Sequence, residues 1–342
     1  MTKHLPVKNV REHPLLVITL LLAVMLAWSL AGSLIHSAQT NRVIANYLVQ
    51  DKSIMALFFN STTPYSLKSI PNPVCRPSTS LDFVAHEDDD LLFMNPDLLH
   101  DIQAGNCVRT IYFTAGDAGR DSVYWLSRQK GAETAYDSML NRVGETWDER
   151  IIKLPDGQLA TLANPSGNDK VTLLFLHMPD GNLRGGGFTR TDHQSLEKLY
   201  TDKINSIETV DNTSSYTSTQ LTQTLISIMQ TFKPNKIRSL SSNSGTANHD
   251  HSDHINVARF KTLAYKAYLA TKPKIIPTIT YYRGYPIRGL PANISSEADI
   301  NNKTKAFLAY GAFDGASCHK LMFCYTQAIY GLYLRREYTS PY

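Results

Sequence analysis

The chain has 342 residues, of which 42% are hydrophobic and 19% are charged, a composition typical of a folded protein with a core. Its formal net charge of +4 is too small to indicate nucleic-acid binding, and no basic stripe with interleaved aromatic residues occurs, so we expect no nucleic-acid partner. The length allows one large domain or two modest ones.

An uncharged apolar run, LLVITLLLAVMLAWSLAGSLI, follows a basic N-terminus and extends over residues 15–35. About 20 apolar residues are enough for a helix to cross a bilayer. The cations Lys3, Lys8 and Arg11 precede the run and favour a cytoplasmic N-terminus. A cleaved signal peptide is the alternative, although the following HSAQT matches a cleavage site poorly.

The predicted order is therefore a cytoplasmic N-terminus at residues 1–14, a transmembrane signal anchor at 15–35, a tether at 36–75 and a folded domain at 76–342. The membrane is then a partner through the N-terminal helix. We expect the folded domain outside the cytoplasm, in a periplasmic, extracellular or lumenal space, or secreted if the segment is cleaved.

Four cysteines are compatible with an exported domain, because an even count permits disulfides there. Cys75 and Cys107 each precede a predicted strand, so neighbouring strands could bring them together. Cys318 and Cys324 are expected on one last helix, nearly two turns apart, which is poor geometry for a disulfide. Four buried free thiols are the alternative.

Strand-like and helical patterns alternate along the domain. Strands are predicted at 81–86, 108–116, 149–154, 171–178 and 236–241, and helices at 122–143, 217–234, 253–271 and through most of 302–338. Such alternation indicates an α/β fold with a mainly parallel sheet and helices on both faces. Ligands of these folds bind at the carboxyl ends of strands. Polar loops follow three of the predicted strands, HEDDD (86–90), AGDAGR (115–120) and SNSGTANHDHSDH (242–254).

The first of these loops places His86 ahead of four consecutive acids. Capping of a helix explains one or two acids, because carboxylates are favoured in a first turn. Four crowded acids raise one another's pKa unless a cation neutralises them. His86 and Asp89 are three residues apart, so both can face one point at a helix start, with Asp88 beside them.

The last loop contains NHDHSDH, residues 248–254, with three histidines within six residues. A solvated polar loop is the plain interpretation. His254 begins a predicted helix and His251 lies three residues before it. Mixed imidazole and carboxylate ligands suit a zinc-like ion, and three protein ligands with water are typical of catalytic zinc. Calcium would prefer oxygen ligands alone.

Three ordered motifs, AHEDDD, TAGDAG and HSDH, resemble those of the PIG-L/LmbE family of N-acetylglucosaminyl-phosphatidylinositol and related de-N-acetylases. The resemblance covers roughly residues 75–340 and implies a Rossmann-like, LmbE-like fold. The family's first motif is commonly A-H-P/A-D-D-E. Here Glu87 replaces the Pro or Ala, and Asp90 replaces the last Glu.

This resemblance implies metal ligands at His86, Asp89 and His254, with Zn²⁺ the expected ion and another divalent metal possible. It places the general base at Asp88 and puts His251 near the substrate carbonyl. The departures at 87 and 90 touch none of the implied ligands, and bear on the shape of the loop and thus on the substrate.

The chemistry these residues allow is amide hydrolysis. Asp88 can take a proton from water and return it to the leaving amine, while protonated His251 can stabilise the oxyanion. Asp253 is expected to orient an imidazole from behind. Further contacts to the substrate are expected from three residues that line the rim or carry charge, Asp117, Arg120 and Arg184.

Taken together, the sequence predicts a zinc-dependent hydrolase that removes the N-acetyl group from an N-acetylated amino sugar in a glycan or glycolipid. Two alternatives stay open, a hydrolase of another N-acyl small molecule and a non-catalytic carbohydrate-binding protein on the same fold. Loss of Asp88 or His251 would have favoured the binding protein, and both are present.

Overall fold

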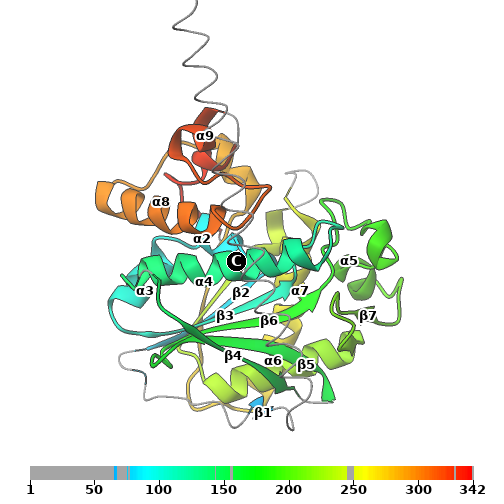
Figure 1. Ribbon diagram of the computed structural model, residues 1–342. Helices are drawn as coiled ribbons and strands as arrows, with labels where there is room; N and C mark the ends of the chain where they lie inside the picture. The colour runs from blue at the N-terminus through cyan, green and yellow to red at the C-terminus, as the bar shows by residue number, and fades with distance from the viewer. Residues whose placement is uncertain are drawn as a thin grey trace, which may run out of the picture. The chain divides into compact units, whose positions relative to one another are not determined.

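A mixed sheet of nine strands is the centre of the described part of the chain (Figure 1). The computed structural model describes residues 65–67, 75, 78–142, 144–154, 157–244, 250–326 and 329–340. The strands in chain order are β1 (Tyr65–Ser66), β2 (Thr79–Val84), β3 (Cys107–Thr114), β4 (Trp147–Lys153), β5 (Leu159–Pro165), β6 (Val171–Met178), β9 (Lys236–Leu240), β10 (Thr278–Tyr282) and β11 (Thr339–Ser340).

The strand order across the sheet is β1-β4-β5-β6-β3-β2-β9-β10-β11. The central strands β6, β3, β2, β9 and β10 are parallel to their neighbours in this group, and β5 and β11 flank them in antiparallel orientation. Every residue of β2, β3 and β6 is buried, as expected for strands that helices cover on both faces. The predicted α/β fold with a mainly parallel sheet is confirmed.

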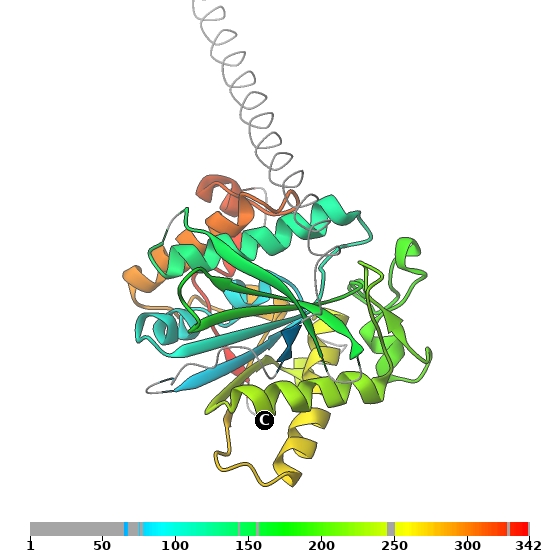
Figure 2. The same cartoon turned by 60° about the horizontal axis from the view of Figure 1, so that its bottom comes forward.

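Helices cover both faces of the sheet (Figures 1 and 2). One face carries α2 (Asp89–Phe93), α3 (Asp97–Gln103), α4 (Ser122–Met139), α8 (Glu297–Gly311) and α9 (Leu321–Thr326). The other carries α5 (Leu196–Tyr200), α6 (Ser218–Phe232) and α7 (Ser252–Ala270). Two separate apolar clusters, one on each face, form the core. Two short strands, β7 (Ile207–Glu208) and β8 (Ser215–Tyr216), form a separate hairpin.

Local sequence signals set the ends of these helices. Helix α6 begins with a capping box, in which Thr217 Oγ1 accepts the backbone N–H of Gln220 while the Gln220 side chain accepts the N–H of Thr217. It ends at Lys233, which adopts a left-handed conformation just before Pro234. Helices α4, α6 and α7 therefore match their predictions within a few residues. The tail is less helical than predicted, because α8 ends at Gly311 and only short helices follow.

Both disulfides lie within the described residues and leave no cysteine free there. Cys75 pairs with Cys107, which stands opposite Thr79 in the β2–β3 ladder, so the expected approach of neighbouring strands is confirmed. The expectation for Cys318 and Cys324 is wrong, because they are bonded with Cα atoms 5.3 Å apart. Helix α9 begins only at Leu321, so Cys318 lies in the preceding loop and is not held at helical spacing.

The predicted anchor at residues 15–35 lies outside the described residues, as does most of the predicted tether. None of the helices in the described ranges combines the length and the apolar character needed to cross a membrane.

Candidate active site

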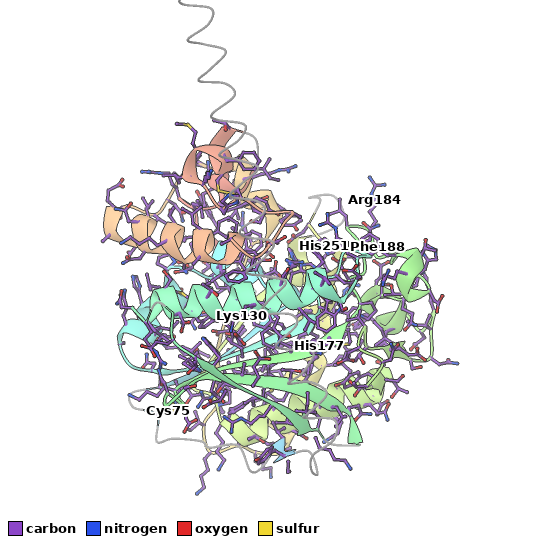
Figure 3. All side chains as sticks on the ribbon, viewed as in Figure 1. Cys75, Lys130, His177, Arg184, Phe188 and His251 are labelled. Carbon is purple, nitrogen blue, oxygen red and sulfur yellow. A yellow bond between two sulfur atoms is a disulfide. The ribbon has the colours of Figure 1, made fainter. Side chains whose placement is uncertain are left out.

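Four polar loops meet at the carboxyl ends of β2, β3, β6 and β9, where the sequence placed the site. Figure 3 shows His251, Arg184 and Phe188 together on this side of the sheet, with Cys75 at the opposite end. The loop after β6 was not among those predicted, and it brings Asp180 to the same place. The sheet therefore supplies the scaffold, and the loops supply the chemistry.

The four consecutive acids are divided among three sets of partners. Glu87 and Asp88 face the guanidinium of Arg128, at 3.4 Å and 2.9 Å respectively. Asp89 faces two imidazoles. Asp90 belongs to α2 and is buried, and its Oδ2 accepts hydrogen bonds from two tyrosine hydroxyls. Different partners thus resolve the repulsion that four adjacent carboxylates would otherwise produce.

A first donor set consists of His86, Asp89 and His254, which are buried and whose ligand atoms lie within 4.8 Å of one another. Oδ2 of Asp89 accepts the backbone N–H of Ala85 at 3.0 Å and that of His86 at 2.8 Å. Its Oδ1 lies 3.0 Å from Nε2 of His254. Burial by itself would raise the pKa of Asp89, but the nearby imidazoles outweigh burial and hold it well below its usual range.

Asp250, which the sequence analysis missed, orients His254. Its Oδ1 lies 2.7 Å from Nδ1 of His254 and also accepts the backbone N–H groups of His251 and Tyr285. This arrangement makes Nδ1 a donor to Asp250 and leaves Nε2 facing Asp89. Nε2 is buried and lies 3.0 Å from Oδ1 of Asp89 without the alignment of a hydrogen bond. The position of Asp250, four residues before His254 in the histidine-rich loop, was the available signal.

The first donor set fits a divalent cation. Two imidazoles and a carboxylate are the mixed ligands that zinc-like ions prefer, and a carboxylate behind an imidazole is typical of such sites. The unpartnered Nε2 of His254 is what an ion would satisfy. His86, Asp89 and His254 are therefore the residues that could hold the ion.

Asp88 stands at the N-cap position of α2, yet its side chain makes no capping hydrogen bond. Capping alone therefore does not explain this residue. Its Oδ1 instead accepts a hydrogen bond from Arg128 Nη2 at 2.9 Å. Burial raises the pKa of Asp88, and the positive charge of Arg128 acts in the opposite direction. The sequence analysis did not identify Arg128, because no motif near it marked a site residue.

His251 is the N-cap residue of α7, and its Nδ1 accepts the backbone N–H of Asp253 at 3.2 Å. Its ring packs edge-on against that of His86, with centroids 4.6 Å apart. Burial, reinforced by the charge of His86, lowers the pKa of His251 to about 4. The ring is then neutral at pH 7, and because Nδ1 accepts, Nε2 carries the proton.

Asp253 and Asp117 are buried and hold the loop after β6. Asp253 Oδ2 accepts the backbone N–H of Gly181 and lies 3.4 Å from Nε2 of His86. Asp117 accepts the backbone N–H groups of Asp180 and Gly119, so its carboxylate supports the rim from beneath.

Arg120 and Arg184 are exposed. The guanidinium of Arg120 stacks on Tyr124, 4.3 Å from the ring centroid, and this contact occupies its face. Arg184 projects outward from the loop after β6, on the same side of the sheet as His251 (Figure 3). The structure thus brings together all the predicted site residues except these two, which stay at the edge.

Comparisons with solved structures give distant likenesses. The conserved protein TT1542 from Thermus thermophilus is 14% identical, with 74% of this chain and 83% of that chain covered and a TM-score of 0.41. The zinc-inhibited form of teicoplanin deacetylase Orf2 is 17% identical, with coverage of 73% and 88% and a TM-score of 0.41. N,N'-diacetylchitobiose deacetylase from Pyrococcus horikoshii is 13% identical, with coverage of 72% and 75% and a TM-score of 0.41.

A comparison with curated protein sequences finds no match. The profile of one protein family, described as GlcNAc-PI de-N-acetylase (PIG-L), matches residues 81–265. This range contains the first donor set together with Asp88 and His251. The chain belongs to the GlcNAc-PI de-N-acetylase, or PIG-L, family.

Proposed function

We propose that this protein is a metal-dependent amide hydrolase that removes the N-acetyl group from an N-acetylated amino sugar in a glycan or glycolipid. The observation that carries the proposal is the buried set His86, Asp89 and His254 with the carboxylate of Asp88 beside it. Membership of the PIG-L family supports the reaction and the class of substrate.

His86, Asp89 and His254 would hold the ion, for which zinc is our first candidate. A divalent cation bound there would polarise the amide carbonyl and lower the pKa of water. The backbone N–H groups of Ala85 and His86 fix one oxygen of Asp89, and Asp250 fixes His254. Both ligands are therefore oriented before any ion binds, which lowers the cost of binding.

Asp88 is the proposed general base. Its carboxylate is buried, and Arg128 holds one of its oxygens at 2.9 Å. The other oxygen takes a proton from the attacking water and returns it to the nitrogen of the leaving amine. Arg128 is the positioning residue, because its hydrogen bond keeps this buried carboxylate in one orientation.

His251 is the proposed donor to the oxyanion. Its Nδ1 accepts a backbone N–H, so Nε2–H is the group available to stabilise negative charge on the former carbonyl oxygen. A neutral ring serves this purpose without a net positive charge in the buried site. Asp253 lies beside both His86 and His251 and positions these two rings.

We place the sugar at the rim of the site. Arg184 is exposed on the loop after β6 and is a candidate contact for a sugar hydroxyl or a phosphate. Arg120 is a weaker candidate because its guanidinium stacks on Tyr124. Asp117 acts by supporting the loop that carries Asp180.

We also propose that residues 15–35 anchor the protein in a membrane with the catalytic domain outside the cytoplasm. The apolar run and the preceding cations support this proposal. A reporter fused after Tyr342 is expected to be active only on the non-cytoplasmic side. Reporter activity in the cytoplasm would contradict the topology, and mature protein beginning near residue 39 would indicate a cleaved signal.

The experiment that tests the reaction is a screen for acetate release. Purified protein with added zinc is incubated with N-acetylated glycans and glycolipids, and a chelator-treated sample serves as the control. Acetate released from a sugar only in the zinc sample supports the proposal. Release from other N-acyl compounds alone would redirect it to a different hydrolase, and glycan binding without release would indicate a carbohydrate-binding protein.

A further inference from the structure

The ring of His86 faces two donor sets, one at each nitrogen. Nδ1 lies 3.4 Å from Oδ2 of Asp89, on the side of the first set. Nε2 lies 3.4 Å from Oδ2 of Asp253 and 3.8 Å from Oδ2 of Asp180. With His251 these residues form a second group, in which all four ligand atoms lie within 4.8 Å of one another.

We call this group the second donor set. It lies in the interior, and hydrogen bonds hold the segments that carry it. The set consists of His86, Asp180, His251 and Asp253. All four residues are less than 8% exposed. Asp180 is held by Asp117, which accepts its backbone N–H at 2.8 Å. The N–H of Gly181 fixes Asp253 Oδ2 at 2.8 Å.

Two ring nitrogens in this set face the two acids. Nε2 of His86 is buried and has no hydrogen-bond partner, although it points at two carboxylates. Nδ1 of His251 is occupied by the N–H of Asp253, and its Nε2 is turned toward Oδ1 of Asp180 at 3.8 Å. A cation between these groups would satisfy the unpartnered nitrogen and both acids.

The spacing fits a small divalent ion. Tetrahedral ligands at zinc bond lengths of about 2.0–2.2 Å are separated from one another by roughly 3.3–3.6 Å. The observed separations from His86 Nε2 to the two acids are 3.4 and 3.8 Å, and His251 lies 3.8 Å from Asp180. Small adjustments of the side chains would bring four donors onto one ion.

We propose that His86, Asp180, His251 and Asp253 form a second site for a zinc-class divalent cation, which fills after the first and inhibits the protein. His86 is shared, with Nδ1 toward the first ion and Nε2 toward the second. When both are bound, His86 bridges them as the imidazolate, and its last N–H proton goes to solvent. For Nε2 of His251 to bind the second ion, its proton moves to Nδ1, which then gives up the backbone N–H of Asp253. The loss of this hydrogen bond makes the second site the weaker one, and Nε2 no longer donates a hydrogen bond.

Counting bound metal tests this site without any substrate. The full-length protein is dialysed against rising free zinc, and bound zinc per chain is measured by elemental analysis. Wild type is expected to bind one ion and then a second at higher concentration. Asp180→Asn removes a charged ligand. It is expected to weaken binding of the second ion at least 10-fold, while the first ion is still bound.

A matched control is Asp202→Asn, an equal loss of charge at an exposed position, which is expected to keep both ions. Asp180→Glu keeps the charge and serves as a second variant. It is expected to weaken binding of the second ion less than Asp180→Asn does. Circular dichroism checks that each variant is folded. Wild type that never exceeds one ion overturns the proposal, whether or not the variants fold.

The proposal is also overturned if a folded Asp180→Asn protein binds the second ion as tightly as wild type. Loss of the second ion to the same extent in Asp202→Asn overturns it as well. The count does not depend on deacetylation, so its result is separate from that of the acetate screen. Where a substrate is found, acetate release by wild type is expected to rise with the first equivalent and fall with the second.

Discussion

Nη2 of Arg128 lies 2.9 Å from Oδ1 of Asp88, inside a cluster in which one buried cation faces three buried carboxylates. Its Nε lies 3.4 Å from both Glu87 and Asp314, and the same nitrogen donates to the hydroxyl of Tyr310. Arg128 comes from α4 and Asp314 from the segment after α8, so this cluster ties the first acidic loop to both helices.

Replacing Arg128 by Met is expected to destabilise the fold. The change leaves Glu87, Asp88 and Asp314 buried without their counter-charge, and breaking such a cluster costs about 3–5 kcal/mol. Urea unfolding followed by circular dichroism measures the free energy. Arg120→Met, at an exposed arginine of the same region, is the control and is expected to change it by less than about 1 kcal/mol. Equal effects of the two changes would show that the cluster is not structural.

Replacing Asp250 by Asn is expected to weaken metal binding about 10- to 100-fold without removing a ligand, because Asp250 orients His254 through its Nδ1. Competition with a fluorescent zinc chelator measures the affinity. Asp211→Asn is the matched control, since Asp211 holds His177, outside both donor sets, at 3.0 Å. An unchanged affinity in Asp250→Asn, or the same loss in Asp211→Asn, would contradict this role.

Lys261 predicts a pH dependence of stability. It is buried on α7, its Nζ has no hydrogen-bond partner, and burial lowers its pKa from the ordinary value of 10.5 to about 7. Between these values the unfolded chain holds a proton that the folded protein lacks, so this residue makes stability rise with pH. Below pH 7 both states are protonated, and the full cost of burying the charge is present.

Lys261→Met removes this cost. The variant is expected to exceed wild type in unfolding free energy at pH 6.5, and the difference is expected to shrink by roughly 2 kcal/mol by pH 9. Urea unfolding at both pH values provides the measurement, with Lys266→Met as the exposed control on the same helix. A difference that stays constant or grows with pH would show that Lys261 is charged in the folded protein.

The sequence predicted the fold and the centre of the site, and missed what distant residues contribute. The buried strands and the helices α4, α6 and α7 follow local patterns, so they were visible. The antiparallel strand β5, LATLANP, was missed because its composition is not typical of a strand. The disulfide between Cys318 and Cys324 depends on where α9 begins, which apolar spacing did not define.

The partners of the acidic loop show the same limit. His86, Asp88 and Asp89 lie in one motif, but Arg128 and Asp180 reach the site from elements far along the chain. Only tertiary packing brings such residues together. No regular spacing of residues in a single sequence reveals that packing. Asp250 was also missed, although it lies within the histidine-rich loop that the sequence singled out.

The account assigns different roles to two adjacent acids, and one pair of variants separates them. Asp88→Asn removes the proposed base while His86, Asp89 and His254 still hold the ion, and general-base assistance is worth about 10²–10⁴ in rate. Acetate release and bound zinc per chain are measured on the same preparations. Asp88→Asn is expected to lower turnover by that order and keep its metal, and Asp89→Asn to lose both. Loss of zinc from Asp88→Asn with retention in Asp89→Asn, or unchanged acetate release in both, would contradict the assignment.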